Sequence, residues 1–483
     1  MKKDLGLLNT FLFIILILES FLNLFGVPVS QAAVFIVEDT VADGDPDSLR
    51  DAIEQANATA EKDTIKLRPG TYILDMGQLE IEQDLEIVGS GAKKSIIDGN
   101  ENDRVFSITT AFNTDIKVKI EKVTVTNGKV EVQVEDIGEP GVAAYGGGIY
   151  NEGILTFNDC IITKNIVDGV AEYGADECGG GGIYNKGNMN INDSSITENT
   201  AGGGMKAGGG GIFNLGNLNI KNSNINNNIA KEAYGSVGGG LVINGNTTIT
   251  NSKVYGNTVD SAQYSDGGGI SCNDDSSSLI ITDSQITENI SNGSYVSTGA
   301  GIYSRCQLTL RNTKVTKNRI GNTILATGGG ISCMQGATIE HSQIIGNSIQ
   351  SAGESFGGGL HCSGGTTIEY SQITDNSAEA AGGSRGGGIA NESSALTISY
   401  SCVTGNTVRG YNPGSSNGGG IYSDAELTLM GSQVTWNTAA CLDIEEEAEC
   451  GEGGGIWIGS SVPYKMDKSV VKKNSPDQIF VEP

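Results

Sequence analysis

Side chains able to carry out acid–base or metal chemistry are sparse in this sequence. Only two histidines, His341 and His361, occur among 483 residues. Neither has the spacing to a cysteine or a second histidine that a zinc site requires. We expect both to be strand-surface residues. Glycoside hydrolysis needs two carboxylates facing one substrate, and no outward position of the repeat described below gathers a compact Asp cluster. The sequence predicts no catalytic residue.

Aromatic side chains recur at a fixed position instead. A Gly-rich tripeptide is followed by Ile or Leu throughout the chain, and the next residue is often aromatic. Exposed aromatic rows bind sugar rings or partner proteins. The alternative is a ladder that only stabilises a sheet or is covered by loops. Loop tyrosines before successive Gly motifs, at 173, 234, 264 and 295, would extend the same surface. Four residues are therefore candidate ligand-binding residues: Tyr150, Tyr184, Phe213 and Tyr303.

The nine cysteines and an acidic loop suggest two further features. Cys441 and Cys450 flank a short acidic insertion and are a candidate local disulfide. The carboxylates between them offer oxygen ligands to Ca²⁺, and the sequence indicates no other cofactor. A run of solvated charges is the simpler interpretation. Cys333 and Cys362 occupy the same repeat position in neighbouring units, as buried free thiols or as a bridge.

These residues are positioned by a repeat. The Gly-rich tripeptide and its Ile or Leu return eleven times between Ile149 and Ile456, most often 29 residues apart. An Ile/Val-Thr-x-Asn mark or a close variant runs in step, from Asn165 to Asn474. A short fixed period indicates a stacked, quasi-one-dimensional array. Length changes collect at a few places, for example after Asn165, and such variable segments are expected to be surface loops.

Each repeat contains three short segments of alternating polarity. In the unit 208–228 these contain Ile212, Leu218 with Ile220, and Ile225. Three strands per coil, each pairing with the coils on either side, predict an all-β, right-handed parallel β-helix. Asn at the bends is expected to form a ladder along the axis.

The N-terminal part divides into two segments. Residues 1–32 are typical of a secretory signal, with Lys2 and Lys3 before an apolar run and small residues up to Ala32; an uncleaved anchor is the alternative. Residues 33–140 are expected to form a capping helix and irregular first coils. Asp45-Pro46 predicts the start of that helix. Regular coils of about 29 residues then occupy 141–470, and 471–483 form a C-terminal tail or cap.

Bulk charge limits the partners. With 57 acidic and 30 basic residues, the formal net charge is −27. Such a surface argues against nucleic acid and anionic membranes, and it disfavours polyanionic substrates unless a local basic cleft or a bound cation intervenes. No segment after the signal is apolar enough to span a membrane. We therefore expect a secreted or cell-surface protein, extracellular or at an outer membrane, of unknown oligomeric state.

The motifs also resemble known families. Asp47-Ser48-Leu49-Arg50-Asp51-Ala52-Ile53, followed by Thr64–Tyr72, resembles the Cys-Ser-Leu-Arg-Glu-Ala domain of exported bacterial β-helix proteins, with Asp replacing Cys and Glu. The repeats resemble those of the pectate-lyase-like superfamily and of polymorphic outer-membrane proteins. Members of that superfamily cleave polysaccharides, but Asn113-Thr114-Asp115 is followed by neither the Asp pair nor the Gly-His-Gly of polygalacturonases.

Together these observations favour a non-enzymatic, adhesin-like scaffold that binds a polysaccharide or a surface protein through one face of the rod. The alternative is a polysaccharide lyase or glycoside hydrolase of the pectate-lyase-like superfamily. A third interpretation is a purely structural spacer.

Overall fold

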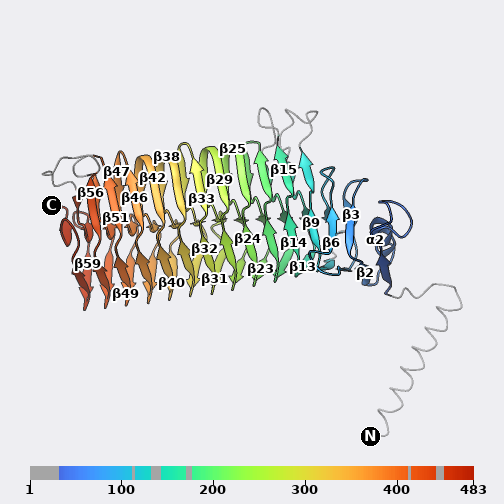
Figure 1. Cartoon of the computed structure of the whole chain (residues 1–483). Coiled ribbons are helices and arrows are strands. Elements are labelled where there is room, and N and C mark those ends of the chain that lie inside the picture. The colour runs from blue at the N-terminus through green and yellow to red at the C-terminus, as the bar shows by residue number, and fades with distance from the viewer. Residues whose placement is uncertain (1–31, 111–114, 132–142, 170–176, 412–414, 442–450) are drawn as a thin grey trace, which may run out of the picture.

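The computed structural model describes residues 32–110, 115–131, 143–169, 177–411, 415–441 and 451–483. Within these ranges the chain is an elongated rod of stacked coils, with one short helix at the N-terminal end (Figure 1). Strands of successive coils pair in parallel, as β17 (Ile183–Asn185) does with β22 (Ile212–Asn214). The predicted right-handed parallel β-helix is confirmed.

The described strands form four sheets, of 15, 18, 14 and 14 strands. In one coil, β22, β23 (Leu218–Lys221) and β24 (Asn224–Asn226) are the three predicted strands, one in each of three sheets. We call the sheet that contains β22 the front sheet. The next segment, assigned to loops by the sequence, is β25 (Ile229–Val237) and belongs to the 18-stranded sheet, here called the lateral sheet.

The core is built from columns of identical or similar residues. The Ile or Leu after each Gly motif points inward and is fully buried. The predicted asparagine ladder is also present. The side chain of Asn289 donates to Asn318 Oδ1 at 2.9 Å and to the carbonyl of Val254 at 3.0 Å. The same pattern links eleven buried residues: Asn165, Asn199, Asn228, Asn257, Asn289, Asn318, Asn347, Asn376, Asn406, Asn437 and Asn474.

The Gly motif lets neighbouring coils approach closely. A Cβ atom on Gly240 would lie 2.6 Å from the carbonyl oxygen of Gly269 and 3.0 Å from the Asn257 side chain. Only a residue without Cβ fits between that backbone and the asparagine ladder. The motif therefore sets the spacing at which the front sheet joins the ladder.

Helix α2 (Leu49–Asn57) covers the N-terminal end of the rod. Its apolar residues are buried as the sequence predicts, but its N-cap is Ser48, whose Oγ accepts from the amide of Asp51 at 3.1 Å. The predicted start at Asp45-Pro46 is therefore wrong, because the chain first makes a turn in which the Ser48 amide donates to the Asp45 carbonyl.

The first coils, although irregular in sequence, extend the same sheets, since β2 (Asp63–Leu67) pairs with β5 (Leu85–Val88) and β5 with β8 (Lys117–Glu121). At the other end, β61 (Ile479–Val481) adds a last strand to the front sheet beside β58 (Ile456–Ile458). In the described part of the chain, no helix is long and apolar enough to cross a membrane. The predicted signal segment lies outside the described residues, apart from Ala32.

Candidate functional site

The lateral sheet shapes the outward face of the front sheet. Within the described residues, each lateral segment leaves an Asn of the ladder on a first leg and returns to the next Gly motif on a second, and buried side chains of the two legs pack on each other. Val167 on the first leg and Cys178 on the returning leg belong to one buried cluster. The returning leg then lies against the front sheet, where Val237 packs with Phe213 and Val242.

This arrangement encloses most of the aromatic column predicted from the sequence. Tyr150, Tyr184 and Phe213 stack on consecutive coils, with ring centroids 5.7 and 5.4 Å apart, as predicted. Tyr184 and Phe213, however, are only 4% and 3% exposed. Their assignment to an exposed face is wrong, because returning legs cover them; Tyr145 stacks on Tyr184 at 4.1 Å. The ligand-binding role of the four residues stays a prediction.

The column is interrupted between Phe213 and Tyr303, where its members are Val242 and Ser271. Val242 lines a cleft of about 570 Å³, which we call the aromatic cleft. Of the predicted site residues, Phe213 and Tyr303 line it, whereas Tyr150 and Tyr184 do not. Its lining also includes Glu177, Met205, Lys206, Tyr234, Val237, Asn244, Tyr264, Asp266, Asn273 and Arg305.

Tyr150 lies in a different, partly exposed setting. Its hydroxyl donates to Glu152 Oε1 at 2.7 Å, and Lys186 Nζ donates to the same hydroxyl at 2.6 Å. Lys186 and Arg104 both lie over the ring, 5.1 and 5.3 Å from its centroid. The Tyr150 ring is therefore already in cation–π contact with side chains of the protein.

Asp266 is the carboxylate that sequence reasoning missed. Its Oδ1 accepts from Thr298 Oγ1 at 2.5 Å, and it stands on the returning leg β29 (Thr258–Asp266). Burial raises the pKa of Asp266, opposed by the Thr298 hydrogen bond and by the charge of Arg305. A single Asp before a Gly motif does not stand out in the sequence, because only the folding of the returning leg onto the front sheet brings Asp266 near Tyr303.

Two polar side chains of the cleft interact electrostatically with Asp266, the phenol of Tyr303 and the guanidinium of Arg305. Burial, together with the charge of Asp266, raises the pKa of Tyr303 to about 12. Arg305 pairs with Asp275, Nε to Oδ1 at 3.1 Å, and both side chains are about half exposed. Such an exposed pair is weak, so the guanidinium remains available to a ligand.

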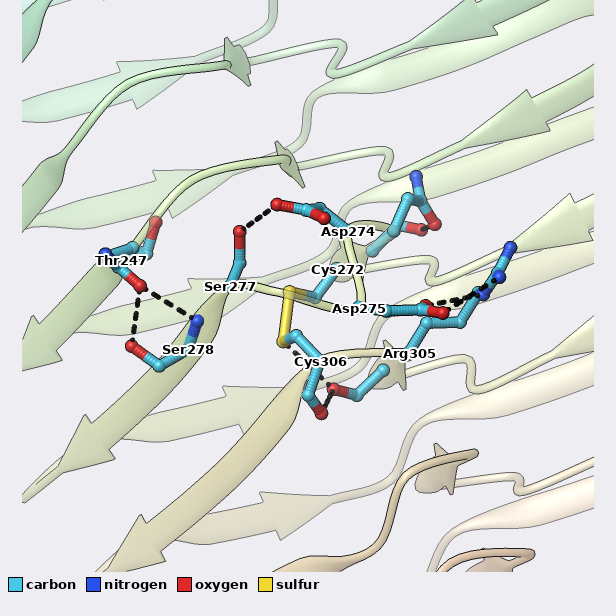
Figure 2. The surroundings of a disulfide bond; sticks show 12 residues. Thr247, Cys272, Asp274, Asp275, Ser277, Ser278, Arg305 and Cys306 are labelled. Carbon is cyan, nitrogen blue, oxygen red and sulfur yellow. Dashed lines mark hydrogen bonds and ion pairs between the residues drawn. A yellow bond between two sulfur atoms is a disulfide. The ribbon is translucent and has the colours of Figure 1, made fainter.

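A disulfide that the sequence did not predict joins Cys272 and Cys306, one coil apart (Figure 2). Figure 2 shows the Asp275–Arg305 ion pair beside the disulfide, and the hydrogen bond that Ser277 Oγ donates to Asp274. Asn273 and Arg305, which line the cleft, are the neighbours of these cysteines in the chain.

Two other predictions concern cysteines. Cys333 and Cys362 are buried and free, which decides between the two alternatives left open. The predicted Cys441–Cys450 disulfide stays a prediction, because Cys450 lies outside the described residues.

The two histidines differ in environment. His341 is exposed and stacks on Tyr370, with ring centroids 5.1 Å apart. His361 is buried, contrary to the expectation of a surface position, because the returning leg carrying Phe356 covers it. Its Nδ1 lies 3.3 Å from Ser332 Oγ, and its Nε2 lies 2.8 Å from Glu392 Oε2. The hydrogen bond with His361 lowers the pKa of Glu392. Ser332 is fully buried, so this trio cannot present a nucleophile to a substrate.

Within the described ranges, no group of three or more His, Cys, Asp or Glu side chains is arranged to hold a metal ion. The acidic loop considered for Ca²⁺ falls at residues 443–449, outside the described residues, and remains a prediction.

No protein-family model matches the sequence. No curated protein matches it either. Among solved structures, the chain is similar to a mannuronic acid specific polysaccharide family 6 lyase from human gut microbiota (10% identity, TM-score 0.38, 93% of this chain and 91% of that chain). It is similar to the A-module of the mannuronan C-5 epimerase AlgE6 from Azotobacter vinelandii (13%, 0.35, 92% and 99%). Pectate lyase Pel9A is also similar (13%, 0.21, 93% and 81%).

Proposed function

We propose that this protein is an exported, cell-surface or extracellular β-helix scaffold that binds polysaccharide in the aromatic cleft without cleaving it. The observation that carries the proposal is the meeting of Tyr234, Tyr264 and Tyr303 with Asp266 and Arg305 in one cleft of about 570 Å³. A sugar ring offers an apolar face to aromatic side chains and hydroxyl groups to polar ones. A concave site with aromatic walls and a few polar groups suits that combination.

The charges favour a neutral glycan. Asp266 holds its proton more tightly than an ordinary aspartate, since burial raises its pKa. Asp275, 3.1 Å away, offsets the charge of Arg305, whose guanidinium can still donate hydrogen bonds to sugar hydroxyls. The net charge of −27 repels polyanionic chains as a whole. We therefore expect neutral polysaccharides to bind more tightly than uronate-rich ones.

The test is retention of the protein on a panel of neutral and acidic polysaccharides, with new chain ends measured in the same samples. Tyr303→Ala and Tyr264→Ala should each reduce retention about tenfold. Tyr464→Ala, at an exposed tyrosine near the C-terminus outside the cleft, is the matched control and should bind like the wild type. If all three variants are retained as well as the wild type, the assignment of the binding site to this cleft is wrong. No retention and no new ends would favour a protein partner or a spacer.

A second candidate is a polysaccharide lyase or glycoside hydrolase acting in the same cleft. It is favoured by the lining, which holds two carboxylates, Glu177 and Asp266. A carboxyl with a raised pKa can donate a proton to a leaving oxygen, and a second carboxylate is the other requirement of hydrolysis. New chain ends that disappear in Asp266→Asn, with retention preserved, would replace the non-enzymatic proposal by this one.

A further inference from the structure

Two more hollows adjoin the aromatic cleft. One, of about 550 Å³, lies at the turns of the lateral segments and shares Met205 and Tyr234 with the cleft. The other, of about 370 Å³, lies at the turns that follow the front-sheet strands and shares Asn244. Each shared side chain lines two neighbouring hollows, so the three adjoin one another, and we call this series of three the groove.

The three hollows follow one another around the rod, and each of them also spans several coils along its axis. All three hollows draw residues from the coils between Gly204 and Ser277, and the cleft extends further, from Glu177 to Arg305. Within those coils the order is lateral turn, returning leg, front-sheet strand β26 (Leu241–Ile243), and the turn through Asn244 and Asn246. This is the order of the chain around one coil, and coils stack along the axis (Figure 1).

The chemistry is similar at both ends. Apolar side chains stand exposed among polar ones: Met205 is 56% exposed at the lateral end and Leu215 38% at the other. Both lysines at these two ends are paired with carboxylates. Lys231 pairs with Glu232, and Lys186 lies 3.3 Å from Glu152.

The remaining polar groups of the last hollow are mostly amides and hydroxyls. Asn217 donates to the side chain of Asn188 at 2.8 Å, which leaves its own oxygen free for a ligand hydroxyl. Asp274 accepts from Ser276 and Ser277, at 2.8 and 2.6 Å. Apolar patches alternating with amides suit a chain of uncharged sugars better than a peptide or a polyanion.

We propose that this groove holds an extended, neutral oligosaccharide of several hexose units that lies transverse to the rod axis. Each hollow alone has the volume of a small-ligand site, which is about 300–1,000 Å³, so three in series fit a chain and not a single ring. The inference rests on the proposed polysaccharide binding and adds the direction, length and charge of the ligand.

The test uses titration calorimetry with cello-, manno- and malto-oligosaccharides, each from the disaccharide to the hexasaccharide. Asn244→Trp places a large ring at the junction between the cleft and the last hollow. Ser363→Trp is the matched control, because Ser363 holds the same repeat position, is similarly half-buried, and lies outside the three hollows. Leu215→Ala removes an exposed anchor without adding bulk, and thermal melting checks the fold of each variant.

We expect affinity to rise with chain length beyond the trisaccharide in the wild type and in Ser363→Trp. In Asn244→Trp the affinity for the hexasaccharide should fall about tenfold, to that for the trisaccharide. Leu215→Ala should lower the affinity for the hexasaccharide by a smaller factor. If trisaccharide and hexasaccharide bind equally, or if neither variant changes the length dependence, the transverse groove is wrong while polysaccharide binding in the cleft stands. If no oligosaccharide binds at any length and no polysaccharide is retained, the proposed function itself fails.

Discussion

The disulfide between Cys272 and Cys306 links two consecutive coils directly beside the aromatic cleft, with their Cα atoms 5.9 Å apart. Asn273 follows the first cysteine and Arg305 precedes the second, and both line the cleft. The bond therefore holds two cleft side chains at a fixed separation. It also closes a segment that includes Asp266's partner Thr298 and the column residue Tyr303.

Replacing both cysteines, Cys272→Ser with Cys306→Ser, should lower the free energy of unfolding by roughly 2–4 kcal/mol, because the unfolded chain regains the freedom of the closed loop. Retention on polysaccharide should fall as well. Denaturant unfolding with and without a reducing agent measures the first effect. The wild type should move towards the variant when reduced, and the variant should not move; identical wild-type midpoints in both conditions would argue against the bond.

Asn318→Ala should destabilise the rod by roughly 2–5 kcal/mol, because two buried donors lose their acceptor. Asn318 Oδ1 accepts from the backbone amide and the side chain of Asn289, at 3.0 and 2.9 Å. Asn219→Ala, an exposed amide on β23, should change stability by less than about 0.5 kcal/mol. Urea unfolding of the two variants compares them, and a similar effect for both would mean that the ladder contributes little.

Gly240→Ala should destabilise the protein strongly, by roughly 3 kcal/mol or more. The new Cβ would meet the Gly269 carbonyl oxygen at 2.6 Å, and neither backbone can move without disturbing the stack. At Gly365, the nearest atom to an added Cβ is 4.0 Å away, so Gly365→Ala should be tolerated. Thermal melting and soluble yield distinguish them. A Gly240→Ala protein that melts with the wild type would show that the coils are further apart than described.

Asp266→Asn should change the pH dependence of stability. Burial raises the folded-state pKa of Asp266 above its unfolded value, so the folded protein binds more protons between the two values and its stability falls as the pH rises through them. Asn is neutral and can still accept from Thr298. The variant should therefore melt above the wild type near neutral pH, and the difference should disappear below the unfolded pKa of about 3.9. A difference that is constant with pH would exclude titration of Asp266 as its cause.

The sequence predicts the repeating coil well. The inward Ile column, the ladder from Asn165 to Asn474 and the buried face of the capping helix all follow from spacing. Parallel strands stack in register, so residues one period apart become neighbours in space. The repeat period in the sequence therefore identifies which residues are in contact. The start of helix α2 was misplaced by three residues, because Asp45 and Ser48 are both competent caps and only the turn between them selects Ser48.

What the sequence by itself determined was the rod, its period and the stacking of Tyr150, Tyr184 and Phe213. The tertiary structure alone decided that the segments after the Asn ladder fold back, so that they bury Tyr184 and Phe213 and leave an open cleft beside Val242. It alone paired Cys272 with Cys306, which stands two residues beyond Ser304, the register partner of Cys272. The physical reason is common to both. These features depend on segments that vary in length and on contacts between unlike repeat positions, where periodicity carries no information.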